Sequence, residues 1–339
     1  MFDEYGVDMG RGGLSLERLK AIRKRQENAG WGSNYEPSIR AVRGEAPGSS
    51  YAVKLRARKI PGREIHLLST GEAAAALLGL YHPDVVGLQE QRALMPDDRP
   101  HPLHNFPGAI AGGLPKLGGM VHVATRLGYL NTLPRVWVPN PDAPAERMAI
   151  IYPYIGDLLW AIRKGKNQFY CVNWSIKDDV SVFKRPVENL AELHSQGNSA
   201  GTSELLERHE LECAYYEGAG IRTVLLGVNE IDAHVVHNLR HLFLHHHRET
   251  GISLRERAEV LERFRRCIEV ETPPAHLIAH LCGTGRYSPE ACRDVLLQGI
   301  WSRELRVDLF RPILIDRPLR SEERDVLVVY ADWFREQSC

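Results

Sequence analysis

The sequence predicts a mixed α/β protein in which a sheet-containing domain is followed by a helical one. Two runs rich in β-branched and aromatic residues flank a charged turn at Gly165, which is typical of a β-hairpin. Strand-like runs alternate with helical patterns up to residue 247, and from Ser253 onward three helix signals follow one another. We therefore expect an N-terminal arm and helix over residues 1–50, an α/β domain over residues 51–250 and a second domain over residues 251–339.

Length and composition are those of a globular protein with about two domains. Of the 339 residues, 43% are hydrophobic and 25% are charged, and the formal net charge is zero. No run of about 18 apolar residues occurs, and the first residues lack the basic and apolar regions of a signal peptide, so we expect a cytoplasmic protein. The six cysteines form no C-x-x-C pair, which favours reduced thiols over a zinc site or a disulfide framework.

The N-terminal part is expected to form an arm, a helix and two strands. Residues 1–13 are expected to be disordered, residues 14–28 have the pattern of a basic amphipathic helix, and residues 51–57 and 65–68 resemble strands. Basic residues outnumber acidic ones between the helix and the second strand, either as an ordinary solvated surface or as an edge that meets a phosphate backbone. The residues of this candidate DNA-binding surface are Arg40, Arg43, Lys54, Arg56, Arg58, Lys59 and Arg63.

A helix with an acid in its first turn follows. Ser69 or Thr70 can cap this helix, and Glu72 lies where the helix dipole favours a negative charge. Taken alone, Glu72 is explained by that dipole. The helix is expected to end at Pro83, and residues 85–91 have the pattern of a buried strand.

Residues 92–145 are rich in proline and glycine and show little periodicity. We expect a long insertion or lid here, with a short helix around residues 120–130. A structureless segment of this length inside a domain indicates function or adaptation. Residues 147–154 are strand-like again and lead into the hairpin.

The hairpin over residues 157–177 carries the candidate chemistry. Asp157 begins its first strand and Lys177 ends its second, so the turn brings both to the same end of the sheet. A carboxylate beside an ammonium group at one strand end resembles metal-dependent nucleases of the PD-(D/E)xK type. There the carboxylate holds a divalent ion, and the lysine orients or helps to deprotonate the attacking water. Acids and lysines also end many hairpins without any such role.

A helix over residues 204–218, a strand over residues 222–228 and a helix over residues 231–247 are expected next. Histidines gather in the last of these helices, at His241, His245, His246 and His247. Because no acids or cysteines stand at ligand spacing from them, a solvated helix end explains them better than a metal site.

The C-terminal domain is expected to open with three helices. Ser253 and Glu256 form a capping box, and the later helices begin near Pro273 and Ser288. Residues 306–309 and 313–316 then alternate as two short strands, and three helices followed by a hairpin is the winged-helix arrangement. Basic and acidic residues are balanced in this domain, so protein binding suits it at least as well as DNA binding.

In their order along the chain, these patches resemble the TnsA endonuclease subunits of heteromeric transposases. Residues 62–72 resemble the family's basic lead-in and helix-borne glutamate, and residues 83–91 its following strand, which ends in Glu-Gln. Asp157 matches the family's metal-binding aspartate, and Lys177 its catalytic lysine. Residues 210–228 and the winged-helix-like tail also fit, so the resemblance covers residues 60 to about 320 in patches.

The resemblance implies a restriction-endonuclease-like fold and a subunit that cleaves the 5′ ends of a transposon. It implies Mg²⁺, for which Mn²⁺ can substitute, held by Glu72 and Asp157, with Lys177 at the attacking water. It also implies three partners: the DNA of the transposon ends, a TnsB-type DDE transposase that acts on the 3′ ends, and a TnsC-type AAA+ ATPase. The family often has Gln or Glu where this chain has Ser175, and Glu212 aligns with a helix glutamate that is expected to have a supporting role.

Two other functions stay open at this point. The chain could be a nuclease of the same fold from restriction or repair, acting without transposase partners. It could also be a catalytically silent adaptor between transposase and ATPase. The near-neutral C-terminal domain argues against the first alternative, and Ser175 is the residue that argues for the second.

Overall fold

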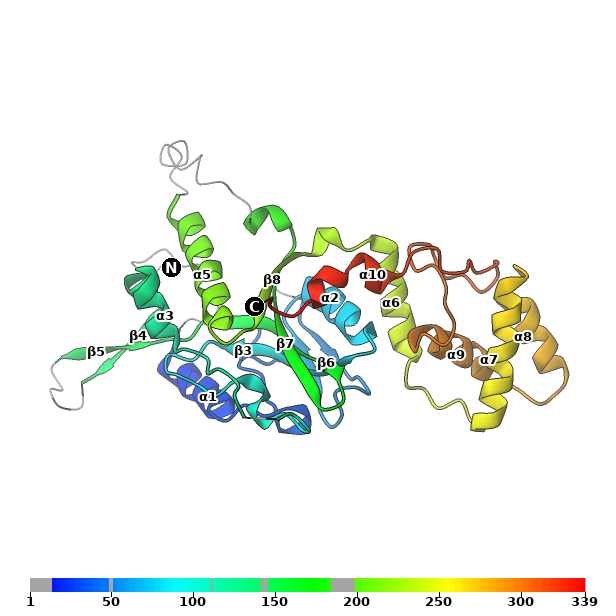
Figure 1. Cartoon of the computed structure of the whole chain (residues 1–339), viewed down its shortest axis with the longest axis horizontal. Helices are drawn as coiled ribbons and strands as arrows, with labels where there is room; N and C mark the ends of the chain where they lie inside the picture. The colour runs from blue at the N-terminus through cyan, green and yellow to red at the C-terminus, as the bar shows by residue number, and fades with distance from the viewer. Residues whose placement is uncertain are drawn as a thin grey trace. The chain divides into compact units, whose positions relative to one another are not determined.

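The computed structural model describes residues 14–48, 51–110, 112–140, 142, 146–183 and 199–338 (Figure 1). The disorder expected for residues 1–13 therefore lies outside the described residues. The chain forms two compact units. The N-terminal unit comprises Met1–Ala73, Asp84–Glu230 and Arg335–Cys339, and the C-terminal unit comprises Ala74–Pro83 and Ile231–Phe334.

The N-terminal unit is built on a mixed four-stranded sheet in the order β3-β6-β7-β8. The predicted hairpin is confirmed, because β6 (Ile155–Gly165) and β7 (Gln168–Lys177) pair antiparallel, with Leu158 opposite Trp174. Strand β3 (Val85–Ala93) pairs antiparallel with β6, and β8 (Arg222–Gly227) runs parallel to β7. The expectation of a mixed α/β fold is thus met.

One face of this sheet is covered by α5 (Ser199–Glu217), with α3 (Met120–Leu127) packed against that helix. Side chains alternate along β6 and β7, so Leu159, Ala161 and Cys171 point into this core. They meet Leu211, Tyr215 and Tyr216 of α5 and Met120 of α3. Because Asp157 and Ser175 have the same parity as these core residues, the strand pattern directs them toward the α5 side as well.

The segment expected as an insertion or lid is largely folded in the described residues. Its short helix is confirmed as α3, and Leu103, Phe106 and Leu117 are buried in the same core. The segment also contains a strand that the sequence did not predict, β4 (Arg135–Pro139), which pairs with β5 (Arg147–Ile151) as a two-stranded ribbon (Figure 1). One side of the ribbon, with Val136 and Val138, packs on α1 (Leu16–Gln26) through Leu19 and Ile22.

A short hairpin precedes α2 (Thr70–Tyr81). Its strands are β1 (Val53–Leu55) and β2 (Ile65–Leu67), paired antiparallel. The predicted cap of α2 is confirmed, since the backbone N–H of Glu72 donates to Ser69 Oγ at 3.0 Å. This bond places Glu72 in the first turn of the helix, next to the end of β2.

The C-terminal unit contains the helices α6 (Ala233–His245), α7 (Leu254–Glu269), α8 (Pro274–Gly283), α9 (Pro289–Trp301) and α10 (Val326–Val329). The capping box of Ser253 and Glu256 is confirmed. Apart from Ala74–Pro83, the unit begins at Ile231, twenty residues before the boundary expected from the sequence, because α6 packs against α9.

The two strands expected after α9 are not formed. In residues 302–325, the described ladder contact is one bridge between Val307 and Ser321. The side chain of Asn238 explains this, because it donates to the carbonyls of Leu309 (2.8 Å) and Arg311 (2.7 Å) and accepts from the N–H of Ile313 (3.2 Å). A hairpin would need these backbone groups for its own ladder.

The expectation that the histidines form a solvated helix end is wrong for two of them. His245 and His246 are buried, with 7% and 6% of their surface exposed. His245 Nδ1 lies 2.5 Å from Asp294 Oδ1 on α9, and the His246 ring stacks on Phe243 at 4.2 Å. These contacts replace water around both rings, and the contact with Asp294 joins α6 to α9.

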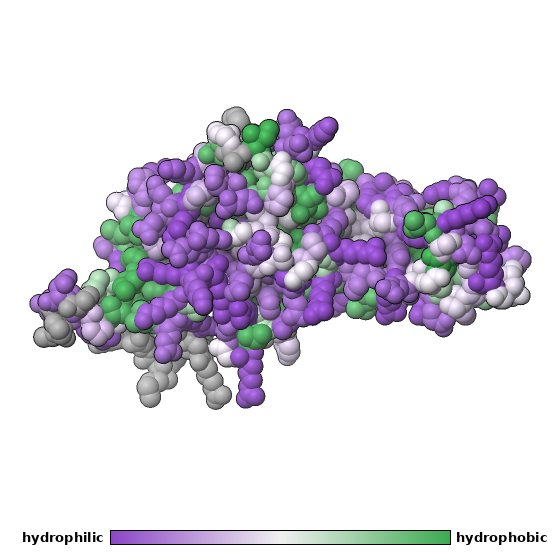
Figure 2. All heavy atoms as spheres, turned by 90° about the horizontal axis from the view of Figure 1, so that it is seen from below, coloured by the Kyte–Doolittle hydropathy of each residue, from purple (hydrophilic) through white to green (hydrophobic). Residues whose placement is uncertain are grey.

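The molecular face in Figure 2 is predominantly hydrophilic, with hydrophobic side chains in scattered small groups. Among the described residues, no helix is both long and apolar enough to cross a membrane.

Candidate metal-dependent active site

Glu72 and Asp157 line the same cleft in the N-terminal unit, although they lie far apart in the sequence. The cleft has a volume of about 510 Å³. It is bounded by the start of α2, the last part of β3, the start of β6, the base of the β4–β5 ribbon and α5. Its lining residues are Leu14, Ile39, Leu68, Glu72, Gln91, Pro134, Tyr152, Pro153, Tyr154, Ile155, Asp157, Leu205 and Arg208.

Glu72 is held in place by two N–H donors. The backbone N–H of Leu68 donates to its Oε2 at 2.8 Å, and Gln91 Nε2 donates to the same oxygen at 2.9 Å. Burial, together with the negative charge of Asp157, raises the pKa of Glu72 to about 8, while the bond from Leu68 and the charge of Lys177 act in the opposite direction. The raised pKa therefore reflects first a carboxyl group withdrawn from water and second the neighbouring charge of Asp157.

Gln91 has an unusual backbone conformation at the point where β3 passes Asp157. Its φ is +51°, in the left-handed region that costs a residue with a side chain about 1 kcal/mol. The β3–β6 ladder pairs Glu90 with Leu158 and Arg92 with Gly156, so Gln91 falls opposite Asp157 where the regular pairing is interrupted. This conformation accompanies the bond from the Gln91 amide to Glu72.

Asp157 is fixed from the neighbouring strand. The N–H of Ile176, the residue before Lys177, donates to Asp157 Oδ2 at 2.6 Å. Within the described residues, no hydrogen bond reaches the other oxygen of either carboxylate, Oε1 of Glu72 or Oδ1 of Asp157. In the described part of the chain, each acid thus accepts hydrogen bonds at one oxygen, and its other oxygen accepts none.

Lys177 ends β7 beside this pair. It pairs with Gly227 of the parallel strand β8 and is half-buried. Its positive charge lowers the pKa of both Glu72 and His209. Glu72 and Asp157 therefore line one cleft, and Lys177 ends the strand next to that of Asp157 without being among the residues that line the cleft.

Ser175 does not take the place of a metal-binding carboxylate. It is buried, and its Oγ lies 3.4 Å from His209 Nδ1 on α5. Burial, with Lys177 and Arg208 nearby, lowers the pKa of His209 to about 3, so the imidazole is neutral at physiological pH. The sequence analysis missed His209, which carries no motif signal of its own.

Glu212 supports the site from α5. It is buried and accepts from Asn173 Nδ2 at 2.9 Å. Burial, and then the charge of Asp157, raises the pKa of Glu212. A Cβ on Gly156 would lie 3.0 Å from Glu212 Oε1, so a larger residue at that position on β6 would require the Glu212 side chain to shift by a few tenths of an ångström.

The donor set of the cleft suits a hard cation such as Mg²⁺. Mg²⁺ is commonly held by one or two carboxylates, with waters and substrate phosphates completing its shell. Glu72 and Asp157 offer one oxygen each. The negative charge of each carboxylate makes a bound cation more favourable beside the other. In the described part of the chain, no group of three or more His, Cys, Asp or Glu side chains could hold a metal ion.

The candidate DNA-binding residues occupy different environments. Arg63 is in the interior, with 8% of its side chain exposed, and its two terminal nitrogens donate to the Glu90 carboxylate at 2.6 and 2.8 Å. It also stacks on Tyr35 at 5.0 Å. Contact with a DNA phosphate was the prediction for Arg63, and these internal contacts give it a structural role instead.

The remaining basic residues lie nearer the surface. Lys54 and Arg56 both pair with Glu64 at 3.1 Å, and burial lowers the pKa of Lys59 to about 8. Arg43 and Arg58 are exposed.

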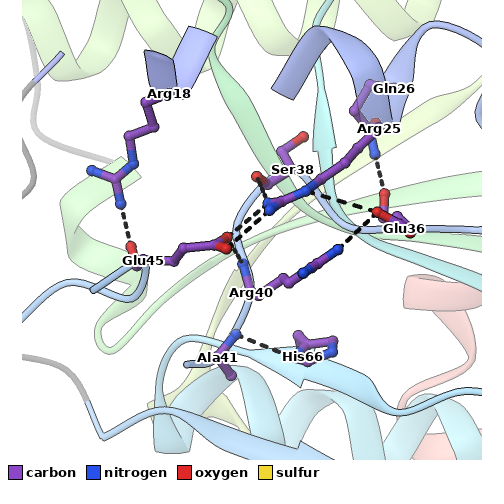
Figure 3. Close-up of polar contacts among 9 residues, drawn as sticks. All are labelled: Arg18, Arg25, Gln26, Glu36, Ser38, Arg40, Ala41, Glu45 and His66. Carbon is purple, nitrogen blue, oxygen red and sulfur yellow. Dashed lines mark hydrogen bonds and ion pairs between the residues drawn. The ribbon is translucent and has the colours of Figure 1, made fainter. Parts of the chain in front are cut away.

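Arg40 belongs to an ion-pair network with α1 (Figure 3). Its guanidinium pairs with Glu36 at 2.9 Å, and Arg25 forms a two-bond pair with Glu45 at 2.7 and 2.9 Å. Glu45 also accepts from the backbone N–H of Arg40, and its backbone carbonyl accepts from Arg18. This network ties the segment after α1 to the helix.

Comparisons with protein-family models and with curated proteins gave no match.

Proposed function

We propose that this chain is a Mg²⁺-dependent DNA endonuclease with a restriction-endonuclease-like core, acting as the TnsA-type subunit that cleaves the 5′ ends of a transposon. The observation that carries the proposal is that Glu72 and Asp157 line one cleft, while Lys177 ends the strand paired with that of Asp157. The resemblance of residues 60 to about 320 supplies the transposase context.

The residues divide the work of phosphodiester hydrolysis among them. Glu72 and Asp157 would hold the metal ion, oriented by the N–H groups of Leu68 and Ile176. A bound Mg²⁺ supplies Lewis-acid polarisation of the phosphate and lowers the pKa of water. Lys177 positions the attacking water and offsets negative charge that develops on the phosphate. Ser175 contributes no oxygen ligand comparable to a carboxylate.

Partners are part of the proposal. The near-zero net charge removes most of the counterion release that drives non-specific DNA affinity, so the isolated chain is expected to bind and cut DNA poorly. A TnsB-type transposase would place it on the transposon ends, and the C-terminal unit would contact a TnsC-type ATPase. Efficient sequence-specific cleavage by the isolated chain would favour the restriction or repair alternative.

The test is the Asp157→Ala variant, assayed with the transposase and ATPase subunits and with breaks mapped strand by strand. Cleavage of the 5′ ends should be lost while 3′-end breakage and assembly persist, so products shift to joined, uncut cointegrates. Asp142→Ala, which removes an exposed acid outside the cleft, is the matched control and should cut normally. Release of both strands by Asp157→Ala would exclude this chain as the 5′-strand nuclease.

The silent-adaptor alternative rests on Ser175, which faces His209 where the family often carries Gln or Glu. It predicts no Mg²⁺-dependent or Mn²⁺-dependent cleavage by the wild-type chain, even in the complete assembly.

A further inference from the structure

The described lining of the cleft contains one charged residue that neither the sequence motifs nor the metal site uses. Among the described residues that line it, Arg208 carries the one basic side chain, facing the same space as Glu72 and Asp157. It comes from α5, four residues before Glu212, so both lie on the same face of that helix. A cation in this position is suited to bind an anion that enters the cleft beside the metal-binding acids.

The Arg208 guanidinium is fixed to the strand that carries Asp157. Its Nη2 donates to the carbonyl of Ile155 at 3.0 Å, and its Cζ lies 5.3 Å from the centre of the Tyr154 ring. The carbonyl contact sets the distance from β6, and the ring supports the guanidinium plane. A guanidinium has five N–H donors, and the bond to Ile155 uses one of them.

This arrangement distinguishes Arg208 from the basic residues of the N-terminal segment. Arg63 uses both terminal nitrogens on Glu90 in the interior, and Arg40 pairs with Glu36 outside the cleft. Among the described residues, Arg208 donates to a neutral carbonyl and not to a carboxylate, although its charge also acts on Glu212 one helical turn away. Its fork of donors matches the oxygens of a phosphate better than the single ammonium of a lysine does.

We infer that Arg208 binds a nonbridging oxygen of the DNA phosphate that lies in the cleft against Glu72 and Asp157. This inference rests on the proposed function for the identity of the ligand as DNA. Tyr154 and the Ile155 carbonyl hold the guanidinium before the phosphate arrives, which lowers the entropy lost on binding. Arg208 is thus a substrate-contacting residue, separate from the acids that hold the metal.

The direct test uses a small probe that needs no turnover. Thymidine 3′,5′-bisphosphate is titrated by calorimetry, in Ca²⁺, into the full chain and into three variants. Arg208→Gln should bind about tenfold more weakly or worse, since it loses a charge-assisted hydrogen bond. Arg208→Lys should fall between, and Arg126→Gln, which removes an exposed arginine of α3, should match wild type. Equal binding by Arg208→Gln and wild type, or no binding by wild type, would overturn the inference.

A second readout separates phosphate contact from packing. The Kd for a fluorescent 30-base-pair duplex is measured in Ca²⁺ across a salt series. One lost phosphate contact lowers the slope of log Kd against log salt by about 0.9, whereas a packing residue lowers the melting temperature and leaves the slope unchanged. If Arg208→Gln does not fold, two other measurements test the inference: the affinity of Arg208→Lys, and the comparison of the bisphosphate with unphosphorylated thymidine. Wild type should bind the bisphosphate and not thymidine.

Failure of this inference can be told apart from failure of the proposed function. Cleavage that requires Asp157 but is indifferent to Arg208 would overturn the assignment of Arg208 alone. Binding of the bisphosphate that depends on Arg208, without cleavage in any assembly, would overturn the nuclease function and retain the phosphate site.

Discussion

Two buried glutamates near the end of β3 illustrate the difference between a structural and a functional carboxylate. Glu90 is completely buried and accepts two bonds from Arg63 and a third from the N–H of His66 at 3.0 Å. Glu72 accepts from two neutral donors, while the charge of Asp157 raises its pKa and that of Lys177 lowers it. Glu90 thus forms a complete ion pair with an arginine, whereas the bonds to Glu72 come from groups without charge.

This contrast identifies the site more firmly than burial does. A buried acid with its own arginine satisfies itself, and any ligand would have to displace that arginine. A pair of acids with one unbonded oxygen each gains from a cation that comes from outside the chain. Among the described residues, Glu72 and Asp157 accept hydrogen bonds from neutral N–H groups only, and this separates the candidate site from the interior salt bridge.

The largest effect is expected at the functional acid. Glu72→Gln should reduce Mg²⁺-dependent cleavage by about three orders of magnitude, because a metal ion supplies several kcal/mol of transition-state stabilisation. The free energy of unfolding should stay the same or rise, since the variant removes repulsion from Asp157. Single-turnover cleavage by the complete assembly and denaturant unfolding measure the two quantities. A large loss of stability with cleavage retained would assign Glu72 a structural role.

The structural acid should respond in the opposite way. Glu90→Gln should lower the free energy of unfolding by about 3 kcal/mol, because it leaves the buried Arg63 guanidinium without its counter-charge. Urea titration followed by circular dichroism gives this value. Cleavage per folded molecule should be near wild type, and a selective loss of cleavage without destabilisation would break the distinction between the two glutamates.

Metal binding itself should be visible as stabilisation. At a Mg²⁺ concentration of ten times its Kd, the wild-type chain should gain about 1.4 kcal/mol of unfolding free energy. Asp157→Asn should gain much less, because one of the two carboxylates is neutral, whereas Asp142→Asn should behave as wild type. Unfolding in EDTA and in a Mg²⁺ series measures this. An equal Mg²⁺ response in Asp157→Asn would place the binding elsewhere.

The smallest effect is expected at an exposed ion pair of the same chemistry as Arg63–Glu90. Glu64 pairs with Lys54 and Arg56 near the surface, where solvent screens the charges. Glu64→Gln should leave the melting temperature unchanged within error, as differential scanning fluorimetry can establish. A drop comparable to that of Glu90→Gln would mean that burial does not explain the difference between the two pairs.

The sequence by itself determined the elements whose signals lie within a few residues. The hairpin around Gly165, the cap at Ser69 and the capping box of Ser253 and Glu256 all depend on neighbouring residues, and all three are present. Helix α3 was likewise predictable. These features follow from local hydrogen bonding and side-chain periodicity, which need no knowledge of the rest of the chain.

Where the local pattern gave a wrong prediction, a side chain distant in the sequence contacts the segment. Residues 306–316 alternate like strands, yet Asn238 takes up their backbone groups from α6. The histidine run looks solvated, yet Asp294 of α9 meets His245. Propensity states only what a segment does when nothing else competes for its polar groups.

Of the candidate site, the sequence supplied Glu72, Asp157 and Lys177 as residue types at element ends. Only the tertiary structure decided that Arg63 serves Glu90, that Gln91 takes a left-handed conformation opposite Asp157, and that Arg208 enters the cleft. The partners in these contacts lie tens of residues apart, and their distances are set by how the sheet, the first turn of α2 and α5 pack together. Local signals act over a helical turn or a strand pair, so the balance of charge around each acid becomes defined only once the chain has folded.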